Sequence, residues 1–278
     1  MANITFLYRA DSTGPVCKRL GEHLNTPYQV VYDEDPNIWD RSGVLLRWGS
    51  RAPIPWYGMV LNSAEAVATA KDKVTARKAL KGLCPPTWFD LDGMEFPCVV
   101  RPGQHHGGQN FSVVNSPKEA LDETRRKIHR RYGWYGSPLI YKWKEFRIFL
   151  LCGKVLAVSE RLPGFERGFA WNLQAGGNLI NVRFDDWPLQ AIKACSTAAF
   201  RLQLDLCAMD VALDYDERPW VFEANTAPGL RNPYTMGRIA KALDWTVEHG
   251  KALPPVDFTS WKSVMHDGLL KEPKDADD

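Results

Sequence analysis

The chain lacks several features that would mark common classes of protein. Its six cysteines include no C-x-x-C pair, which argues against a zinc site or a disulfide set. No apolar stretch is long enough to span a bilayer, and the N-terminal residues lack the basic region and apolar run of a secretory signal. The net charge of +2 gives no case for nucleic acid as the main partner. We therefore expect a cytoplasmic protein with no membrane or nucleic-acid partner.

The composition is that of an ordinary soluble globular protein, with 45% hydrophobic and 24% charged residues. Its 278 residues allow one large domain or two to three small ones. At the N-terminus, apolar patterning predicts strands at Ile4–Tyr8, Tyr28–Tyr32 and Val44–Arg47, with a helix at Val16–Leu24. Strand, helix, strand and strand in this order indicate a small α/β unit.

The most informative segment is a predicted hairpin whose strands are Met209–Leu213 and Trp220–Ala224, joined by a polar turn. Asp210 lies in the first strand, and Glu223 and Asn225 lie two residues apart at the end of the second. Residues two apart in a strand face one side, and antiparallel pairing can place Asp210 on that side too. Three hard oxygen donors in an apolar setting suit Mg²⁺ rather than zinc. The alternative is a surface hairpin, but apolar neighbours make a poor place for an unpaired Asp210.

A glycine-rich loop follows Arg101 and contains Gly103, Gly107 and Gly108. Between two strands it predicts a flexible hairpin whose backbone N–H groups can cover a phosphate. The neighbouring His105 and His106 have no third ligand at a useful spacing, so no metal site is expected there. Further elements are expected as helices at Asn62–Lys81, Ser116–Arg131, Pro188–Leu204 and Asn232–Leu243, and as strands at Phe96–Arg101, Phe111–Val114, Leu139–Trp143, Phe146–Leu151 and Lys154–Glu160.

With these segments placed, the chain resembles the ATP-grasp superfamily of carboxylate–amine ligases, over roughly Arg47 to Leu230. The most specific match is the acid strand followed by Glu-x-Asn-x-x-Pro-Gly-Leu. Within the superfamily it looks closest to the branch that adds glutamate to protein or peptide ends. That likeness runs through Glu160-Arg161 and through Asn172-Leu173-Gln174-Ala175-Gly176-Gly177.

The resemblance implies an α/β fold with α+β lobes, the ATP-grasp fold behind an N-terminal Rossmann-like pre-ATP-grasp domain. The implied division is 1–62 for that domain, 63–138 for a small subdomain with its linking helix, and 139–278 for a large C-terminal subdomain. The implied reaction is ATP-dependent: a carboxylate becomes an acylphosphate, an amine displaces phosphate, and an amide, ADP and phosphate result. The implied cofactors are ATP and Mg²⁺, with Mn²⁺ as an acceptable substitute.

The implied partners are a carboxylate and an amine, each a small molecule or a peptide, and self-association stays open. Two other readings remain beside the ligase. One is a small-molecule kinase on the same fold, which would leave a stable phosphorylated product. The other is a non-catalytic ATP-binding module, which the departures described below encourage.

Residue by residue, the resemblance implies that Asp210 holds one Mg²⁺, Glu223 bridges two and Asn225 holds the second. Cationic and polar positions near the transferred phosphate and the acceptor are matched by Arg147, Arg161 and Asn172. The remaining implied nucleotide contacts are Lys73 and Arg101 on the phosphates, the loop glycines Gly103, Gly107 and Gly108 over them, and the hinge backbone of Tyr141, Lys142 and Trp143 beside adenine.

The chain also departs from the family pattern. Arg101 stands where the family has a lysine, which keeps the charge but adds bulk. The hinge is rich in lysine where the family has an acid. Places that are basic in the glutamate-adding branch carry Ala170, Gln174 and Ala175, which predicts a different acceptor. For Arg147 and Arg161, an ion pair with Glu145 or Glu160 is the competing interpretation.

Overall fold

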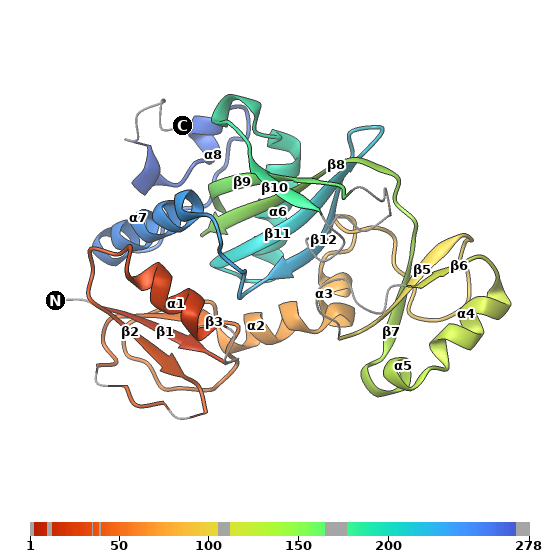
Figure 1. Ribbon diagram of the computed structural model, residues 1–278, viewed down its shortest axis with the longest axis horizontal. Coiled ribbons are helices and arrows are strands. Elements are labelled where there is room, and N and C mark those ends of the chain that lie inside the picture. Colours follow the sequence, from red (N-terminus) through yellow and green to blue (C-terminus); the bar gives the residue numbers. More distant parts are fainter. Residues whose placement is uncertain are drawn as a thin grey trace.

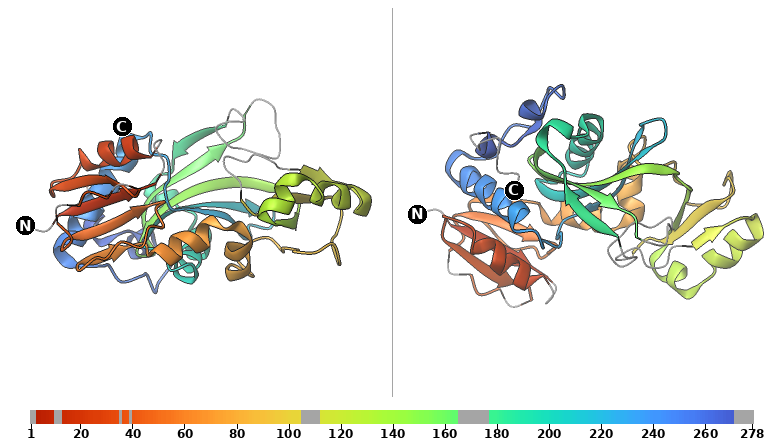
Figure 2. Two further views of the ribbon diagram at one scale, coloured as in Figure 1. Left: turned by 90° about the horizontal axis from the view of Figure 1, so that it is seen from below. Right: turned by 45° about the horizontal axis from the view of Figure 1, so that its top comes forward.

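The fold is built on three β-sheets, and Figure 1 shows them along the longest axis of the molecule. The structure is a computed structural model that describes residues 3–9, 13–34, 36–38, 40–104, 112–164 and 177–270. An N-terminal sheet lies at one end, a small three-stranded lobe at the other, and a five-stranded sheet between them (Figure 1). Both views in Figure 2 keep this order, so the central sheet separates the two smaller units.

The N-terminal sheet contains β1 (Ile4–Tyr8), β2 (Tyr28–Tyr32), β3 (Val44–Trp48) and β4 (Met59–Leu61). All its pairings are parallel, in the order β2-β1-β3-β4. Every residue of β3 is buried, as expected for a strand covered on both faces. Helix α1 spans Gly14–Gly21, so it begins and ends earlier than the apolar spacing predicted. The α/β unit is confirmed, with β4 as an addition that the patterning did not indicate.

Two short helices lead from this sheet to the small lobe: α2 (Ala64–Lys71) and α3 (Lys73–Ala79). The expectation of one helix over Asn62–Lys81 was wrong. Asp72 has extended backbone angles (φ −80°, ψ 106°), and its carboxylate accepts a hydrogen bond from the Thr75 N–H at 2.8 Å. This aspartate therefore ends one helix and caps the next. The restart places Lys73 at the first position of α3.

The small lobe has an antiparallel sheet of β5 (Cys98–Pro102), β6 (Ser112–Val114) and β7 (Trp134–Pro138), in the order β6-β5-β7. Helices α4 (Pro117–Thr124) and α5 (Lys127–Tyr132) accompany it. Ser116 caps α4, since its hydroxyl accepts a hydrogen bond from the Glu119 N–H. The single helix expected over Ser116–Arg131 was wrong, because Arg126 leaves helical geometry (ψ 147°) and splits it.

The central sheet is antiparallel, in the order β10-β9-β8-β11-β12. Its strands are β8 (Lys142–Leu151), β9 (Lys154–Leu162), β10 (Asn178–Asn181), β11 (Leu206–Asp214) and β12 (Pro219–Asn225). The predicted hairpin is thus confirmed as β11 and β12. The two strands expected over Leu139–Trp143 and Phe146–Leu151 are instead one strand, β8, and residues 139–141 form the link from the small lobe.

Helices cover the central sheet and connect it to the N-terminal sheet. Helix α6 (Leu189–Arg201) packs through an apolar stripe against β8, β11 and β12. Helix α7 (Pro233–His249) packs against β9 and α1, and α8 (Trp261–Val264) follows it. Short 3₁₀ turns lie at Phe184–Asp186 and Asp267–Leu269. The N-terminal sheet ends at Leu61, the sheet of the small lobe ends at Pro138, and the central sheet begins at Lys142. The division into 1–62, 63–138 and 139–278 remains our proposal.

Among the described residues, no helix is both long and apolar enough to cross a membrane. The largest core lies between the central sheet and α6, and it continues through α7 into the N-terminal sheet. The small lobe has a separate core of five buried side chains. Two lobes with separate cores, joined by short links, can change their relative position without exposing either core.

Candidate active site

The hairpin of β11 and β12 brings the two predicted carboxylates together. Asp210 pairs directly with Glu223, and Asn225 pairs with Ala208. Directly opposed residues share a face, and Asn225 shares the face of Glu223 because it lies two residues on. The register shifts between Asp210 and Val211, so a β-bulge lies beside the acid. The expected arrangement of three oxygen donors on one face is therefore present.

Two arginines from neighbouring strands hold the carboxylate of Asp210. On β8, Arg147 pairs with Asp210 and donates from Nε to Oδ1 and from Nη2 to Oδ2, both at 2.8 Å. On β9, Arg161 donates from Nη2 to Oδ1 at 3.1 Å. The first contact is a two-pronged guanidinium–carboxylate pair, which fixes both groups in orientation as well as charge. The predicted acid Asp210 and the two predicted cations thus form one hydrogen-bonded group.

Burial and charge act in opposite directions on this unit. Only 7% of Asp210 is exposed, and burial by itself would raise the pKa of its carboxyl. The guanidinium groups of Arg147 and Arg161 outweigh burial and lower that pKa to about 2. In return, the Asp210 carboxylate raises the pKa of the Arg147 guanidinium. Asp210 and Arg147 therefore keep their charges over the whole physiological pH range.

A second buried acid, Glu145, joins the group formed by Asp210, Arg147 and Arg161. The sequence interpretation considered it only as an alternative ion-pair partner for the arginines. Glu145, 3% exposed, accepts from Arg161 Nη1 at 2.7 Å through Oε1 and pairs with Lys142 through Oε2. Burial lowers the pKa of Lys142, against the opposing effect of the Glu145 carboxylate. The competing interpretation was therefore correct for one pair, Arg161 with Glu145. Its signal in the sequence was the strand spacing that puts Glu145 and Arg147 on one face.

Lys73 reaches the same face from outside the sheet. Its ammonium lies 2.7 Å from Glu223 Oε1, and its backbone N–H donates to the Gly103 carbonyl at 2.9 Å. Gly103 in turn donates to the Gly133 carbonyl at 2.9 Å, and a Cβ on Gly103 would lie 2.3 Å from a backbone oxygen. The start of α3 and the start of the glycine-rich loop are thus fixed to each other beside the acid hairpin.

One further residue connects the acid hairpin to the small lobe, and the sequence interpretation did not single it out. The Arg77 guanidinium donates from Nη2 to the Phe222 carbonyl at 3.1 Å and lies 5.1 Å from the centre of the Tyr135 ring. It is 6% exposed. Its position four residues after Lys73 on α3 gives the only sequence signal, since residues four apart share a helix face.

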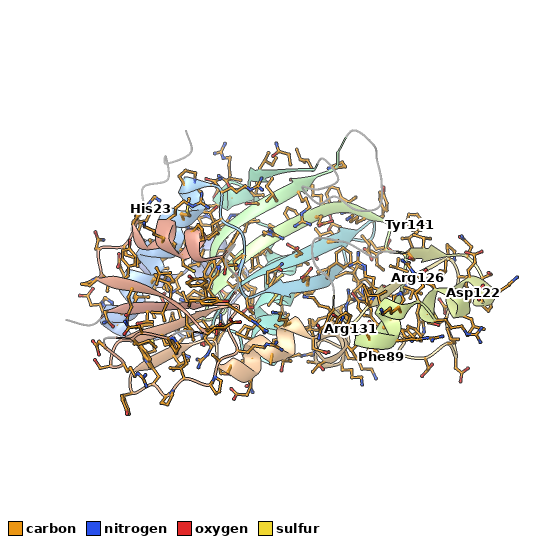
Figure 3. The ribbon with its side chains drawn as sticks, turned by 60° about the horizontal axis from the view of Figure 1, so that its bottom comes forward. His23, Phe89, Asp122, Arg126, Arg131 and Tyr141 are labelled. Atoms are coloured by element: carbon orange, nitrogen blue, oxygen red, sulfur yellow. The ribbon has the colours of Figure 1, made fainter. Side chains whose placement is uncertain are left out.

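The other predicted nucleotide contacts that the structure describes lie on the small lobe and on its link to the central sheet. Arg101 is half-buried on β5, opposite Tyr135. Figure 3 shows Tyr141 where the chain passes from the small lobe to the central sheet, and this side chain is 61% exposed. Lys142 and Trp143 begin β8 directly after it. Gly107, Gly108 and Asn172, with His105, His106 and the departures at 170–175, lie outside the described residues.

The donor set fits magnesium. Carboxylate and amide oxygens on one face are hard ligands, and Glu223 and Asn225 are both partly exposed. Across the described residues, no cluster of three His, Cys, Asp or Glu side chains has the arrangement of a metal site, which leaves the mixed set with Asn225 as the candidate. Arginine and lysine already neutralise both acids, so a cation entering here would exchange with these partners rather than meet bare carboxylates.

Known proteins match this chain in sequence and in fold. No family model matches it. Two D-alanine–D-alanine ligases of Synechococcus sp., from strains JA-2-3B'a(2-13) and JA-3-3Ab, are each 24% identical to it, over 277 and 281 residues. Each match covers 84% of this chain, and 83% or 84% of the relative.

Solved structures show the same architecture. The ATP-grasp ligase PsnB with its minimal precursor gives a TM-score of 0.62 at 14% identity, covering 87% of this chain and 99% of PsnB. The D-alanine–D-alanine ligase of Bacillus anthracis with ATP gives 0.61 at 15% identity, covering 90% and 96%. PsnB has also been solved with Mg and ADP. The chain therefore has the fold of the ATP-grasp ligases and is similar in sequence to D-alanine–D-alanine ligases.

Proposed function

We propose that this face of the central sheet activates a carboxylate as an acylphosphate and passes it to an amine. The observation that carries the proposal is a row of charges across four strands, in which the cations Arg161 and Arg147 are followed by the acids Asp210 and Glu223. Lys73 joins the row from α3, beside Glu223. Phosphoryl transfer to a carboxylate brings several negative groups together, and fixed cations lower the cost of doing so. The row of charged side chains supplies such cations, and they are already held in position by their ion pairs.

Each residue then has a role. Glu223, Asn225 and Asp210 would hold Mg²⁺, which when bound shields the phosphate oxygens from one another. Lys73 and Arg101 bind phosphate oxygens, and Gly103 begins the loop beside them. Arg147 and Arg161 face the transferred group, and their pairing with Asp210 holds them rigid, so less reorganisation is needed during the reaction. The hinge at Tyr141, Lys142 and Trp143 lies beside the base.

The substrates are proposed at the level of class. The Synechococcus relatives are ligases for D-alanine, and PsnB has been solved with a precursor peptide. A small amino-acid carboxylate or a peptide carboxylate is therefore our candidate donor, with an amine as acceptor. We also propose a place near the glutamate-adding branch, because Arg161 of its pattern lies in the charge row. Ala170, Gln174 and Ala175 support an acceptor other than that of the branch.

The setting of the reaction is also a proposal. All six cysteines are free, and five of them are buried. Burial raises the pKa of the Cys17, Cys195 and Cys207 thiols, which keeps them protonated and unreactive. Unpaired thiols suit a reducing compartment, and we propose the cytoplasm. Self-association is left to measurement.

The test is release of ADP and phosphate with Mg-ATP, a panel of amino acids and peptides, and an amine, followed by mass spectrometry of the product. We expect an amide that appears with ADP, and loss of turnover in Glu223→Gln or with EDTA. Glu217→Gln, in the exposed turn of the same hairpin, is the matched control and should match the parent. A stable phosphorylated product would identify a kinase, and ATP binding without release would identify a non-catalytic module.

A further inference from the structure

Helix α3 carries two cations, one turn apart, that both contact the edge strand β12. Lys73 Nζ lies 2.7 Å from Glu223 Oε1, and Arg77 Nη2 donates to the carbonyl of the preceding strand residue, Phe222, at 3.1 Å. Residues four apart share a helix face, so the two cations act on neighbouring residues of one strand. Lys73 therefore reaches Glu223 from a helix that Arg77 attaches to the same strand.

Arg77 also contacts the small lobe. Its guanidinium carbon lies 5.1 Å from the centre of the Tyr135 ring, and Tyr135 lies on β7 directly opposite Arg101 of β5. Figure 1 shows α3 between the central sheet and this lobe. One side chain thus touches both the strand that carries Glu223 and the strand beside the predicted phosphate contact Arg101.

A contribution to stability does not explain this arginine. It is 6% exposed, and no carboxylate pairs with it among the residues that the structure describes. Its Nη1 is buried and has no hydrogen-bond partner in the same part of the chain. Burying a cation without a counter-charge and leaving an N–H group unpaired both oppose folding. The contacts of Arg77 are therefore better explained by the position that they give to α3.

The buried arginines of the central sheet differ from Arg77 in this respect. Arg147 and Arg161 each pair with a carboxylate, at distances from 2.7 to 3.1 Å. Arg77 instead contacts a backbone carbonyl and the face of a ring, which fix the direction of its guanidinium without neutralising it. Such contacts hold one element against another.

We propose that Arg77 is a positioning residue for the nucleotide. It holds α3 between β12 and the small lobe, so that the Lys73 ammonium stays beside Glu223, where the phosphates are expected. This inference rests on the proposed ligase function and deepens it, because it names the residue that keeps the phosphate contact Lys73 in place. A shift of about 1 Å in such a contact is enough to weaken it strongly.

The test measures binding of AMPPNP with Mg²⁺ to the full-length protein by calorimetry, with no carboxylate or amine substrate present. Arg77→Met removes the guanidinium and fills similar space, and it should weaken binding at least about 10-fold. Arg77→Lys keeps a cation that can donate to the Phe222 carbonyl, so its affinity should lie within about threefold of the parent. Lys78→Met, which changes the next and exposed cation of α3, is the matched control and should bind like the parent.

A second comparison separates positioning from a general loss of structure. If Arg77 acts through Lys73, the change Arg77→Met has little left to disturb in the Lys73→Met background. We therefore expect the double variant to bind within about twofold of Lys73→Met alone. A structural role of Arg77 would weaken binding equally in both backgrounds.

The fold should tolerate these changes. The Val221 N–H donates to the Leu83 carbonyl at 2.9 Å, so the segment after α3 keeps its own attachment to β12. Without ligand, the thermal midpoint of Arg77→Met should lie within about 4 °C of the parent. In turnover assays, the same variant should raise KM for ATP and leave KM for the carboxylate substrate unchanged.

Several outcomes would overturn the inference. They are unchanged affinity in Arg77→Met, equal losses with and without the Lys73→Met change, and no recovery in Arg77→Lys. A fall of more than about 10 °C in the ligand-free midpoint of Arg77→Met would assign the residue to the fold instead, and absence of AMPPNP binding to the parent would also refute the role. Failure of the ligase proposal differs: no amide forms with any carboxylate and amine, while AMPPNP binding and its dependence on Arg77 persist.

Discussion

The change Asp210→Asn tests how much the central charge cluster contributes to the fold. Asparagine keeps the shape of the side chain but removes the charge between Arg147 and Arg161. The two guanidinium groups then face each other across a neutral amide, and Arg161 keeps its ion pair with Glu145. Removing one partner of a buried ion pair leaves the other without compensation, which is strongly destabilising.

The magnitude follows from the carboxyl pKa of Asp210, which is 3.8 for the free side chain and about 2 in the fold. At about 1.36 kcal/mol per pKa unit, this difference corresponds to about 2 kcal/mol in favour of the ionised form. Asparagine resembles the protonated form and adds the cost of the uncompensated arginines. We therefore expect a loss of about 2 to 5 kcal/mol in the free energy of unfolding at pH 7.

The lowered pKa of Asp210 determines how the stability difference between the parent and Asp210→Asn changes with pH. A carboxyl whose folded pKa is depressed stabilises above its unfolded pKa and loses that contribution as pH falls toward the folded value. The difference between the parent and Asp210→Asn should thus be constant from pH 7 to about 5 and shrink between about pH 4 and pH 2. Urea unfolding followed by tryptophan fluorescence, without nucleotide or metal, measures it at each pH.

Asp216→Asn is the control, because Asp216 is exposed in the turn of the same hairpin. We expect a change within about 0.5 kcal/mol there. A loss below about 1 kcal/mol in Asp210→Asn, or a loss that stays constant down to pH 2.5, would refute the reasoning. Either result would mean that the arginines find other partners at little cost, and that Asp210 is not the centre of the cluster.

Three further predictions test other parts of the molecule. Lys73→Met, which removes the cation 2.7 Å from Glu223, should lower kcat/KM for ATP on the order of 100-fold in an ADP-release assay, whereas the exposed Lys78→Met on the same helix should not. His266 is buried, which lowers its pKa from 6.5 to about 4, so the parent should lose up to about 3 kcal/mol of stability between pH 6.5 and pH 4, and His266→Asn should flatten that slope in urea unfolding. Gly103→Ala places a Cβ 2.3 Å from a backbone oxygen and should cost more than about 2 kcal/mol, while Gly237→Ala, in α7 with open space around it, should gain about 0.5–1 kcal/mol in thermal unfolding. A thermal midpoint that moves equally in both glycine variants would contradict the last of these.

The elements that sequence patterning located well are those whose pattern is local. The hairpin at β11 and β12 has apolar strands with a polar turn between them, and its two acids meet as the strand period requires. In the α/β unit at the N-terminus, β3 is buried along its whole length and β1 is buried at four of its five residues. Such signals lie close together in the chain, with the two acids 13 residues apart (223 − 210), so the sequence contains them in full.

The two predictions of a single long helix, over Asn62–Lys81 and over Ser116–Arg131, were wrong for the same reason. Apolar spacing continues through Asp72 and through Arg126, while the backbone at each leaves helical geometry. At Asp72, the side chain offers the Thr75 N–H a better partner than a continuing helix does, and aspartate is well suited to that exchange. Hydrophobic periodicity shows which face of a helix is buried. It does not show that one side chain ends a helix by capping the next one.

The partners of Asp210 show what distance in sequence conceals. Its position among apolar neighbours required a compensating charge, and that requirement was visible. Arg147 lies 63 residues away and Arg161 lies 49, so only sheet order decides that β8 and β9 bring them there. The same pairing changes the meaning of the acid, because a carboxylate held by two guanidinium groups positions those cations as much as it offers oxygens to a metal. Under our proposal, Glu223 and Asn225, on the open edge strand, would therefore accept Mg²⁺ at the lower cost. Asp210 would contribute to the same site while holding the two arginines in place.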